Sequence, residues 1–268
     1  MKLLLTADIH YSLPQYDWLA RVAPAFDAVI VAGDHLDISS HVDGRAQIVV
    51  VLKYLERIAR VTRLMVCSGN HDLDSRDEHG EKVAKWMSRF RDVDVPADGD
   101  AFSIGEMLFT ICPWWDGPNA KQRIALQLAR DAARAKKRWI WIYHAPPAGS
   151  CTSLEGDKSF GDAELARWMD QYRPDFLFSG HVHNAPFRQG GSWIDRVGPT
   201  WVFNAGRQIG PVPAHIVLSL DNKSALWFSL AGPEIAPLDG QPAYPIRKLT
   251  EPPSWLTAPG GVPGPTPA

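Results

Sequence analysis

The chain has 268 residues, a formal net charge of −2 and 45% hydrophobic residues, which is ordinary for a globular protein. A chain of this length forms one large domain with a sizeable core or, less favoured, two small ones. The net charge argues against a generally basic surface for nucleic acid, although a locally basic groove stays open. No apolar run approaches the roughly 18 residues of a membrane-spanning helix. We therefore expect no membrane association and a cytoplasmic location.

The cysteines and residues 1–5 agree with the expected cytoplasmic location. Cys67, Cys112 and Cys151 are far apart in the sequence and form no Cys-x-x-Cys pair. An odd number leaves at least one thiol without a disulfide partner. We expect buried, reduced thiols and no thiolate zinc site. The apolar run at residues 1–5 is too short for a signal peptide.

Short apolar runs alternate with helical stretches in the first half of the chain. We predict strands where a few apolar residues precede a polar turn, and helices where apolar residues recur every three or four positions. The predicted elements are strands at 2–5, 28–32 and 64–67, helices at 45–60 and 82–90, and a hairpin of 101–104 with 107–111. Further on, the same patterns predict helices at 119–136 and 162–172 and strands at 139–143, 176–178, 200–203, 214–220 and 224–230. Asp162 is the expected N-cap of its helix.

This order of elements predicts the fold class. Strands that alternate with helices early and pair as hairpins later are typical of an α/β protein with mixed sheets. We predict two mixed sheets in a sandwich flanked by helices, within a domain of residues 1–231. From about residue 232, proline and glycine become frequent. Residues 232–268 are therefore predicted to form an extended or partly disordered tail on the surface.

Side chains that can bind metals follow five of the predicted strands, at the carboxyl end of each. In open α/β sheets this edge is where functional sites are built. The set combines carboxylate, imidazole and amide groups, which suits Mn²⁺, Fe or Zn²⁺ better than Ca²⁺. Its members are Asp8, His10, Asp34, Asn70, His71, His144, His181 and His183.

Such a set has a clear chemical use. Two cations roughly 3.5–4 Å apart polarise a phosphoryl group and convert water to hydroxide near neutral pH. A carboxylate with two oxygens is the natural bridge between them, and a histidine that binds no metal can protonate the leaving alkoxide. The sequence therefore predicts a metal-dependent hydrolase of phosphate esters, either diesters or monoesters, that uses a hydroxide between two metal ions.

The motifs also resemble a known family. The order Asp8-x-His10, Gly33-Asp34-x-x-Asp37, Gly69-Asn70-His71-Asp72, His144 and Gly180-His181-x-His183 is similar to the signature of the calcineurin-like metallophosphoesterase superfamily. That resemblance implies a four-layered αββα sandwich with the metal site at the carboxyl ends of the strands. It also implies two metal ions, for which we expect manganese first, with iron or zinc as alternatives.

The resemblance assigns a role to each residue of the motifs. One metal would be bound by Asp8, His10 and His183, and the other by Asn70, His144 and His181. Asp34 would bridge the two metals. Asn70 and His71 would contact the substrate, with His71 as the acid that faces the leaving group and a phosphate oxygen. Asp37 would orient the ring of His71, as carboxylates orient imidazoles elsewhere.

The residues that follow Asp37 and His71 narrow the choice of group within the superfamily. Protein Ser/Thr phosphatases of this superfamily carry Gly-Asp-x-x-Asp-Arg-Gly and Gly-Asn-His-Glu, whereas Ile38 and Ser39 follow Asp37 here and Asp72 follows His71. This favours the bacterial-type group of phosphodiesterases, phosphomonoesterases and nucleases, with a small phosphate ester or nucleotide as substrate. A DNA or RNA nuclease on the same core is the alternative, although no basic groove is evident. A non-enzymatic scaffold is less favoured, because the whole ligand set is present.

Other residues near the motifs invite a functional interpretation. We interpret His35 as a neighbour of the site and His215 as solvated or structural, because neither has a ligand's position in the motifs. For Trp114 and Trp115, ordinary packing is favoured over stacking on a nucleobase. A turn at Asn204 that braces the site is favoured over a direct contact with phosphate by Asn204 or Arg207. Substrate specificity is expected from loops at 11–18, 113–118 and 145–159.

Overall fold

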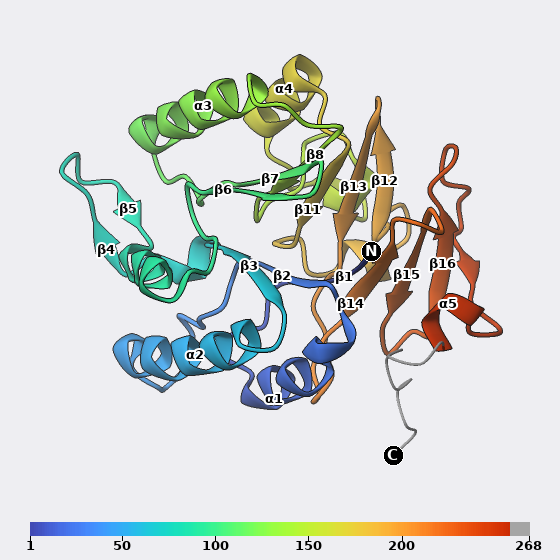
Figure 1. The fold of residues 1–268 in the computed structure, drawn as a ribbon, viewed down its shortest axis with the longest axis horizontal. Helices are drawn as coiled ribbons and strands as arrows, with labels where there is room; N and C mark the ends of the chain where they lie inside the picture. Colours follow the sequence, from blue (N-terminus) through green and yellow to red (C-terminus); the bar gives the residue numbers. More distant parts are fainter. Residues whose placement is uncertain (258–268) are drawn as a thin grey trace.

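The computed structural model describes residues 1–257. Two large mixed sheets lie at its centre, and helices cover their outer faces (Figure 1). The seven-stranded sheet has the order β17-β16-β15-β14-β1-β2-β3. Its strands are β1 (Lys2–Thr6), β2 (Ala28–Ala32), β3 (Arg63–Cys67), β14 (His215–Ser219), β15 (Ser224–Phe228), β16 (Glu234–Pro237) and β17 (Arg247–Lys248).

The six-stranded sheet has the order β12-β13-β11-β8-β7-β6. Its strands are β6 (Ala101–Ile104), β7 (Met107–Ile111), β8 (Arg138–Ile142), β11 (Phe176–Ser179), β12 (Ile194–Val197) and β13 (Thr200–Asn204). Two small hairpins project from the sandwich, and each has two short strands. They pair β4 (Ser75–Arg76) with β5 (Lys82–Val83) and β9 (Leu154–Glu155) with β10 (Lys158–Ser159).

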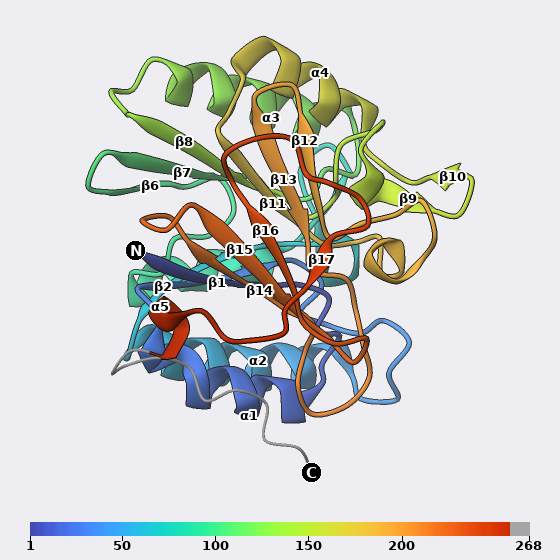
Figure 2. The same ribbon diagram turned by 90° about the vertical axis from the view of Figure 1, so that its right-hand side faces the viewer.

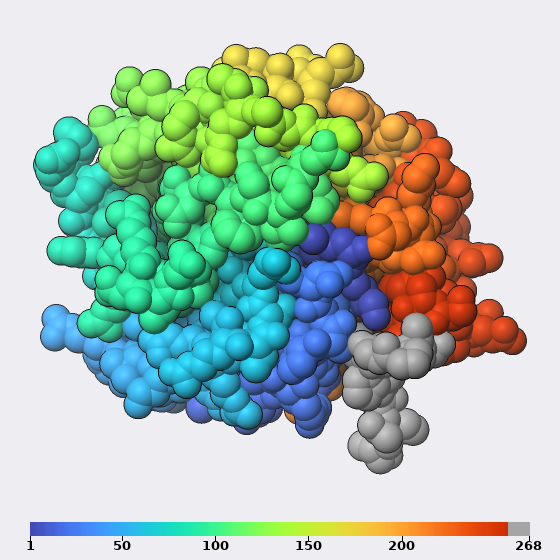
Figure 3. All heavy atoms as spheres, in the orientation of Figure 1, coloured from blue at the N-terminus to red at the C-terminus, as the bar shows by residue number. Residues whose placement is uncertain are grey.

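Four helices form the two outer layers. α1 (Leu13–Val22) and α2 (Gly44–Ala59) cover the seven-stranded sheet, and α3 (Pro118–Ala132) and α4 (Ala163–Tyr172) cover the six-stranded sheet. In the space-filling view, the first pair, in blue, forms the lower surface and the second pair, in green and yellow, forms the upper surface (Figure 3). The four-layered αββα sandwich is therefore confirmed.

The burial of alternate residues explains why the layers stack this way. In β1, Leu4 packs against the helix layer, while Leu3 and Leu5 pack between the two sheets. In β8, Ile140 packs between the sheets and Trp141 packs beneath α3 and α4. Successive side chains of a strand point to opposite faces, so a sheet with apolar residues on both faces must be covered on both sides.

Parallel pairing brings the ends of separate strands to one edge. β1 pairs with β2, and β2 with β3, in parallel register. In the other sheet, β8 pairs in parallel with both β7 and β11. Parallel neighbours need a crossover connection, which α1 and α2 supply between β1, β2 and β3. In Figure 2, β1 runs from the amino terminus on the left toward the edge where the β9–β10 hairpin projects.

Several predicted elements differ from the observed ones. Residues 13–18, predicted as part of a specificity loop at 11–18, belong to α1. The helix predicted at 82–90 is instead the short strand β5 and a 3-10 helix at Lys85–Val93. β12 was not predicted, because Asp195 and Arg196 interrupt its apolar pattern. The three cysteines are free, as expected, although only Cys67 and Cys112 are buried.

The first part of the predicted tail joins the large sheet. β16 pairs with β15 in antiparallel register, and α5 (Ser254–Thr257) follows β17. Ala236, Ile246 and Leu256 are buried in the core. The predicted boundary at residue 231 therefore falls between two paired strands of one sheet, and the rest of the predicted tail, residues 258–268, lies outside the described residues. No helix in the described range is long and apolar enough to cross a membrane.

The buried His215 makes the stability of the fold depend on pH. Its ring stacks on Phe228 with centroids 5.1 Å apart, and its Nδ1 donates to the Pro213 carbonyl at 2.9 Å. Burial lowers the pKa of His215 to about 4 from its ordinary 6.5. Between these two values the unfolded chain binds a proton that the folded chain does not, so the free energy of unfolding falls as the pH falls from 6.5 to 4.

The variant His215→Asn tests this effect, because Asn keeps a donor for Pro213 but does not titrate. Wild type should lose about 2 kcal/mol more of its free energy of unfolding between pH 7 and pH 5 than the variant does. Urea unfolding at the two pH values, in the presence of a chelator, measures the difference. Equal losses in the two proteins would contradict the prediction.

Candidate metal centre

Five loops meet at the edge where β1, β2, β3, β8 and β11 end. Backbone hydrogen bonds join them: Asp8 N donates to Gly33 O at 3.1 Å, and Gly180 N donates to His144 O at 2.8 Å. The side chains converge on Asp34, whose Oδ2 lies 3.2 Å from His144 Nε2 and 3.5 Å from His10 Nε2. Residues from both sheets therefore surround one carboxylate.

The first group of donor atoms is formed by Asp8, His10, Asp34 and His183. One donor atom from each lies within 4.8 Å of the others. His183 Nε2 is 3.2 Å from Asp8 Oδ1 and 3.1 Å from His10 Nε2. Two imidazole nitrogens and two carboxylates that point to one place form a donor set of the kind that binds transition metals.

A second group of donors lies on the other side of Asp34. His181 Nδ1 is 2.9 Å from Asn70 Oδ1, and the rings of His181 and His144 have centroids 5.2 Å apart. His144 Nδ1 donates to the Ala32 carbonyl at 2.7 Å, so Nε2 is the ring nitrogen that faces Asp34. Among the described residues, this buried Nε2 has no hydrogen-bond partner. An orphaned imidazole nitrogen that faces a carboxylate fits a cation between the two groups.

The backbone is strained at the same positions. Asp8, His10, Asp34 and His181 all have positive φ angles, of 55°, 45°, 53° and 66°. Such angles are uncommon for residues other than glycine and cost about 1–3 kcal/mol each. The fold therefore holds four of the candidate ligands in conformations that their own backbone disfavours.

Two glycines allow the carboxylates to lie against the backbone. A Cβ atom on Gly69 would lie 2.2 Å from Asp34 Oδ1, and one on Gly180 would lie 2.4 Å from Asp8 Oδ2. In the space that these glycines leave, the neighbouring amides bind the carboxylates. His71 N donates to Asp34 Oδ1 at 2.8 Å, and His181 N donates to the two oxygens of Asp8 at 3.1 and 3.0 Å.

Burial and charge set the protonation states of the site. Burial lowers the pKa of His10 and of His181 to about 4, so both rings are neutral at pH 7, as metal ligands must be. Burial opposes a charge on His144, but the carboxylates of Asp34 and Asp8 raise its pKa to about 9. A cation beside Asp34 would balance the same negative charge and leave the His144 ring neutral.

His71 lies at the edge of this cluster. Its ring meets the ring of His10 edge-on, with centroids 4.4 Å apart, and it lines a cavity of about 550 Å³. His71 does not belong to the first group of donors, although its ring lies close enough to His10 and Asp37 for all three to offer atoms within 4.8 Å of one another. The ring is therefore next to the centre and open to a bound molecule.

Asp37 makes no hydrogen bond to His71 among the described residues. Its carboxylate accepts from Ser39 N at 2.8 Å, while Ile38 N lies 3.4 Å from His71 Nδ1. Asp37 is not the N-cap of a helix either, because Asp43 caps α2 by accepting from Arg45 N. No hydrogen bond in the described part of the chain therefore supports the predicted role of Asp37 in orienting His71.

Asp72, which stands where the protein phosphatase motif has glutamate, positions two loops of the site. Its buried carboxylate accepts from His35 N and Leu36 N, both at 2.9 Å, and from Gly69 N at 2.8 Å. These bonds tie the loop after β2 to the loop after β3. The place of Asp72 directly after Asn70 and His71 was the signal that could have revealed this role.

Hydrogen bonds show the structural roles of Asn204 and His35. Asn204 is buried and donates to Thr152 O and Val182 O, each at 3.0 Å, so it braces the loop that carries His181 and His183. His35 is enclosed in the core, with Nε2 3.0 Å from the Cys67 carbonyl, and it is no ligand of the cluster.

Trp114 packs against the core and also contacts the candidate metal centre. The residue packs against the core beneath α3 and α4, but its ring also covers His181, with centroids 5.1 Å apart. Sequence patterns that indicate packing do not reveal which face of a partly buried ring remains open.

Comparisons with known proteins agree with this geometry. Residues 1–185 match the family model described as calcineurin-like phosphoesterase, and the chain therefore belongs to this family. Among curated proteins, "Probable inactive purple acid phosphatase 27" of Arabidopsis thaliana is 29% identical over 153 residues, which are 48% of this chain. The chain covers only 24% of the length of that relative.

Solved structures share the fold at low identity. The Thermus thermophilus protein TT1561 has a TM-score of 0.57 and 13% identity, with 88% of this chain and 98% of that chain covered. Purple acid phosphatase PPD1 from yellow lupin (Lupinus luteus) seeds has a TM-score of 0.54 and 17% identity, with 92% and 53% covered. A dimetal phosphatase from Danio rerio has a TM-score of 0.52 and 10% identity, with 85% and 95% covered.

Proposed function

We propose that this protein hydrolyses phosphate esters with the help of two metal ions bound around Asp34. Members of its family are metal-dependent phosphoesterases. The observation that supports the proposal most strongly is the buried Nε2 of His144, which faces the Asp34 carboxylate at 3.2 Å without a hydrogen bond. A cation between this nitrogen and the carboxylate would satisfy both buried groups at once.

The two groups of donors suggest one metal each. We assign Asp8, His10 and His183 to the first cation and Asn70, His144 and His181 to the second. Asp34 lies between the groups and is the proposed bridge. The mixture of imidazole, carboxylate and amide groups favours Mn²⁺, with Fe or Zn²⁺ as alternatives. Two such cations polarise a phosphoryl group and supply hydroxide near neutral pH.

The residues of the chain have separate tasks in this reaction. Asp34 and Asp8 are held by backbone amides, so their free lone pairs face the donors opposite them. His71 lies beside the centre with its ring open to the cavity, where it could hydrogen-bond a phosphate oxygen and donate a proton to the departing alkoxide. Asn70 lies beside it as a second contact for the phosphate.

Arg207 is a further candidate for contact with the phosphate. Its backbone N donates to His183 O at 3.1 Å, and its charge adds to burial in lowering the pKa of His10. The exposed guanidinium has no ion pair among the described residues. We expect Arg207→Ala to lower kcat/KM about ten-fold, chiefly by raising KM, because a charge-assisted hydrogen bond is lost.

Steady-state kinetics of Arg207→Ala, Arg207→Lys and Arg21→Ala check this expectation. The lysine variant should recover part of the loss, and Arg21, an exposed residue of α1, serves as the control for removal of a surface charge. Unchanged KM in Arg207→Ala would exclude the contact.

The proposed activity is tested with purified protein reconstituted with Mn²⁺, Fe²⁺ or Zn²⁺. Hydrolysis of bis-p-nitrophenyl phosphate and p-nitrophenyl phosphate is followed, and bound metal is measured by elemental analysis. About two equivalents of metal and turnover of at least one ester are expected. Folded protein that binds metal but turns over neither ester with any of the three ions would count against the proposal.

A further inference from the structure

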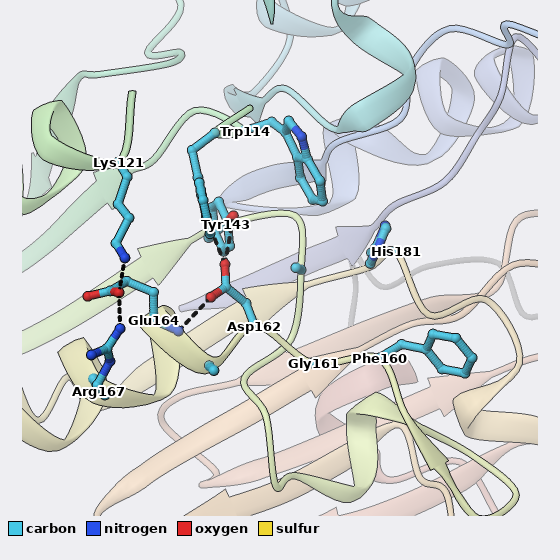
Figure 4. Close-up of a pocket in the computed structure, with 12 residues that line it drawn as sticks. Trp114, Lys121, Tyr143, Phe160, Gly161, Asp162, Glu164, Arg167 and His181 are labelled. Carbon is cyan, nitrogen blue, oxygen red and sulfur yellow. Dashed lines mark hydrogen bonds and ion pairs between the residues drawn. The ribbon is translucent and has the colours of Figure 1, made fainter. Parts of the chain in front are cut away.

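A second cavity opens beside the metal centre, on the side of His181. It has a volume of about 420 Å³, within the usual range of small-molecule sites. Its walls include the aromatic side chains of Trp114, Trp115, Tyr143 and Phe160, and Figure 4 labels all of these except Trp115. His181 lines this cavity and also belongs to the second group of donors. A molecule bound at the centre can therefore extend into the cavity.

The inner walls of the cavity are fixed by Asp162. Its Oδ2 accepts from Trp115 Nε1 at 2.7 Å and from Tyr143 OH at 3.0 Å. Its Oδ1 accepts from two amides in the first turn of α4, Glu164 N and Leu165 N. These four hydrogen bonds satisfy the Asp162 carboxylate, which needs no further donor. Two aromatic side chains are thus held in place before any ligand binds.

The other charged groups of the cavity are also paired. The carboxylate of Glu164 forms ion pairs with both Lys121 and Arg167 (Figure 4). Lys121 Nζ additionally lies over the Trp115 ring, 5.5 Å from its centroid. The charges of the cavity wall therefore satisfy one another, and what it offers a ligand is chiefly aromatic surface. Such a lining favours an uncharged planar group.

Phe160 supplies an aromatic ring that the fold leaves uncovered. Its side chain is 50% exposed, and Figure 4 shows it on the other side of His181 from Trp114. Trp114 itself stacks on Tyr143 with an interplanar angle of 12°. Trp114 and Phe160 line the same cavity as His181, which connects it to the metal centre.

The two cavities are lined by different residues of the centre. His71, which lines the other cavity, packs on His10 of the first group, whereas His181 packs on His144. A departing group beside His71 and a second group beside His181 therefore have separate places. A phosphate with two organic substituents is a phosphodiester.

We propose that the cavity lined by Trp114 and Phe160 binds the retained organic group of a phosphodiester, and that this group is planar and aromatic, as in a nucleoside. This inference rests on the proposed phosphoesterase function. Base–aromatic stacking contributes about 1–3 kcal/mol per base when tested by alanine substitution, so the preference for an aromatic retained group should be large enough to measure.

The test uses three p-nitrophenyl esters that share one leaving group and differ in the retained group. These are p-nitrophenyl thymidine 5′-phosphate, methyl p-nitrophenyl phosphate and cyclohexylmethyl p-nitrophenyl phosphate. With wild type, kcat/KM should be highest for the thymidine ester. In Phe160→Ala, the ratio of kcat/KM for the thymidine ester to that for the methyl ester should fall about ten-fold. The control Leu126→Ala removes an exposed apolar side chain of α3 and should keep the wild-type ratio.

Each outcome bears on one of the two proposals. Equal kcat/KM for the cyclohexylmethyl and thymidine esters, or an unchanged ratio in Phe160→Ala, would overturn the inference while leaving the phosphoesterase function intact. If no ester is turned over, the phosphoesterase proposal fails, and calorimetric titration then decides on the cavity. Binding of thymidine 5′-monophosphate at least ten-fold tighter than methyl phosphate would support the aromatic site, and equal binding would exclude it.

Discussion

Replacing Asp34 with asparagine is expected to lower kcat about 10³-fold or more and to reduce the bound metal below two equivalents. Oδ1 of Asp34 accepts a hydrogen bond from His71 N, so the amide oxygen of the variant would take that place. The amide NH₂ would then face His10 and His144, where the wild-type oxygen stands 3.5 and 3.2 Å from their Nε2 atoms. An NH₂ group has no lone pair for a cation, and the negative charge of the bridge is lost.

Asp94→Asn is the matched control. It makes the same change of charge at an exposed residue with a positive φ of 55°, a conformation that asparagine adopts as readily as aspartate does. The control should keep both activity and metal. Elemental analysis and the rate with bis-p-nitrophenyl phosphate measure the two effects. If Asp34→Asn keeps two equivalents of metal and more than a tenth of the activity, Asp34 is not the bridge.

The convergence of the donors was predictable because sheet topology determines it. Each predicted ligand follows a short apolar run, and parallel strands bring their carboxyl ends to one edge. The sequence pattern was therefore sufficient to bring Asp34 and His144 together, although 110 or so residues separate them in the chain. Asp34 follows a strand of the seven-stranded sheet, and His144 follows a strand of the six-stranded sheet. The sandwich places the ends of these two strands against each other.

The supporting contacts were not predictable in the same way. Asp72 ties two loops together through backbone amides, and such bonds depend on loop conformations that periodicity does not encode. The positive φ angles of Asp8 and His10 are likewise imposed by the fold against the preference of the residues. Local patterns identify what a residue can bind, whereas tertiary structure decides which partner it meets.

The aromatic cavity illustrates the same limit. A pair of tryptophans after a strand is usually explained by packing, and both Trp114 and Trp115 do pack against the core beneath α3 and α4. Only the hydrogen bond from Trp115 to Asp162 and the contact of Trp114 with His181 reveal that they also line a cavity at the centre. Residues 145–159, predicted as a specificity loop, lead into that cavity through Phe160.

The second large effect is expected for His71→Asn. His71 contacts the ring of His10 but stands outside the first group of donors, so the variant should keep two equivalents of metal. If His71 protonates the leaving group, its loss should slow esters of poorly acidic alcohols by about 10²–10⁴-fold. Esters of p-nitrophenol should be affected much less, because that anion departs without a proton. The exposed His79, replaced by asparagine, controls for the loss of an imidazole.

The dependence on the leaving group separates proton donation from the other roles of His71. Rates of His71→Asn and wild type are compared for a series of aryl and alkyl diesters that differ only in the acidity of the departing alcohol. A steeper dependence in the variant identifies His71 as the proton donor, since the alkoxide charge is then no longer neutralised as the bond breaks. A uniform loss across the series would mean that His71 only holds a phosphate oxygen. Loss of metal would instead make it a ligand, because its ring lies within reach of His10 and Asp37.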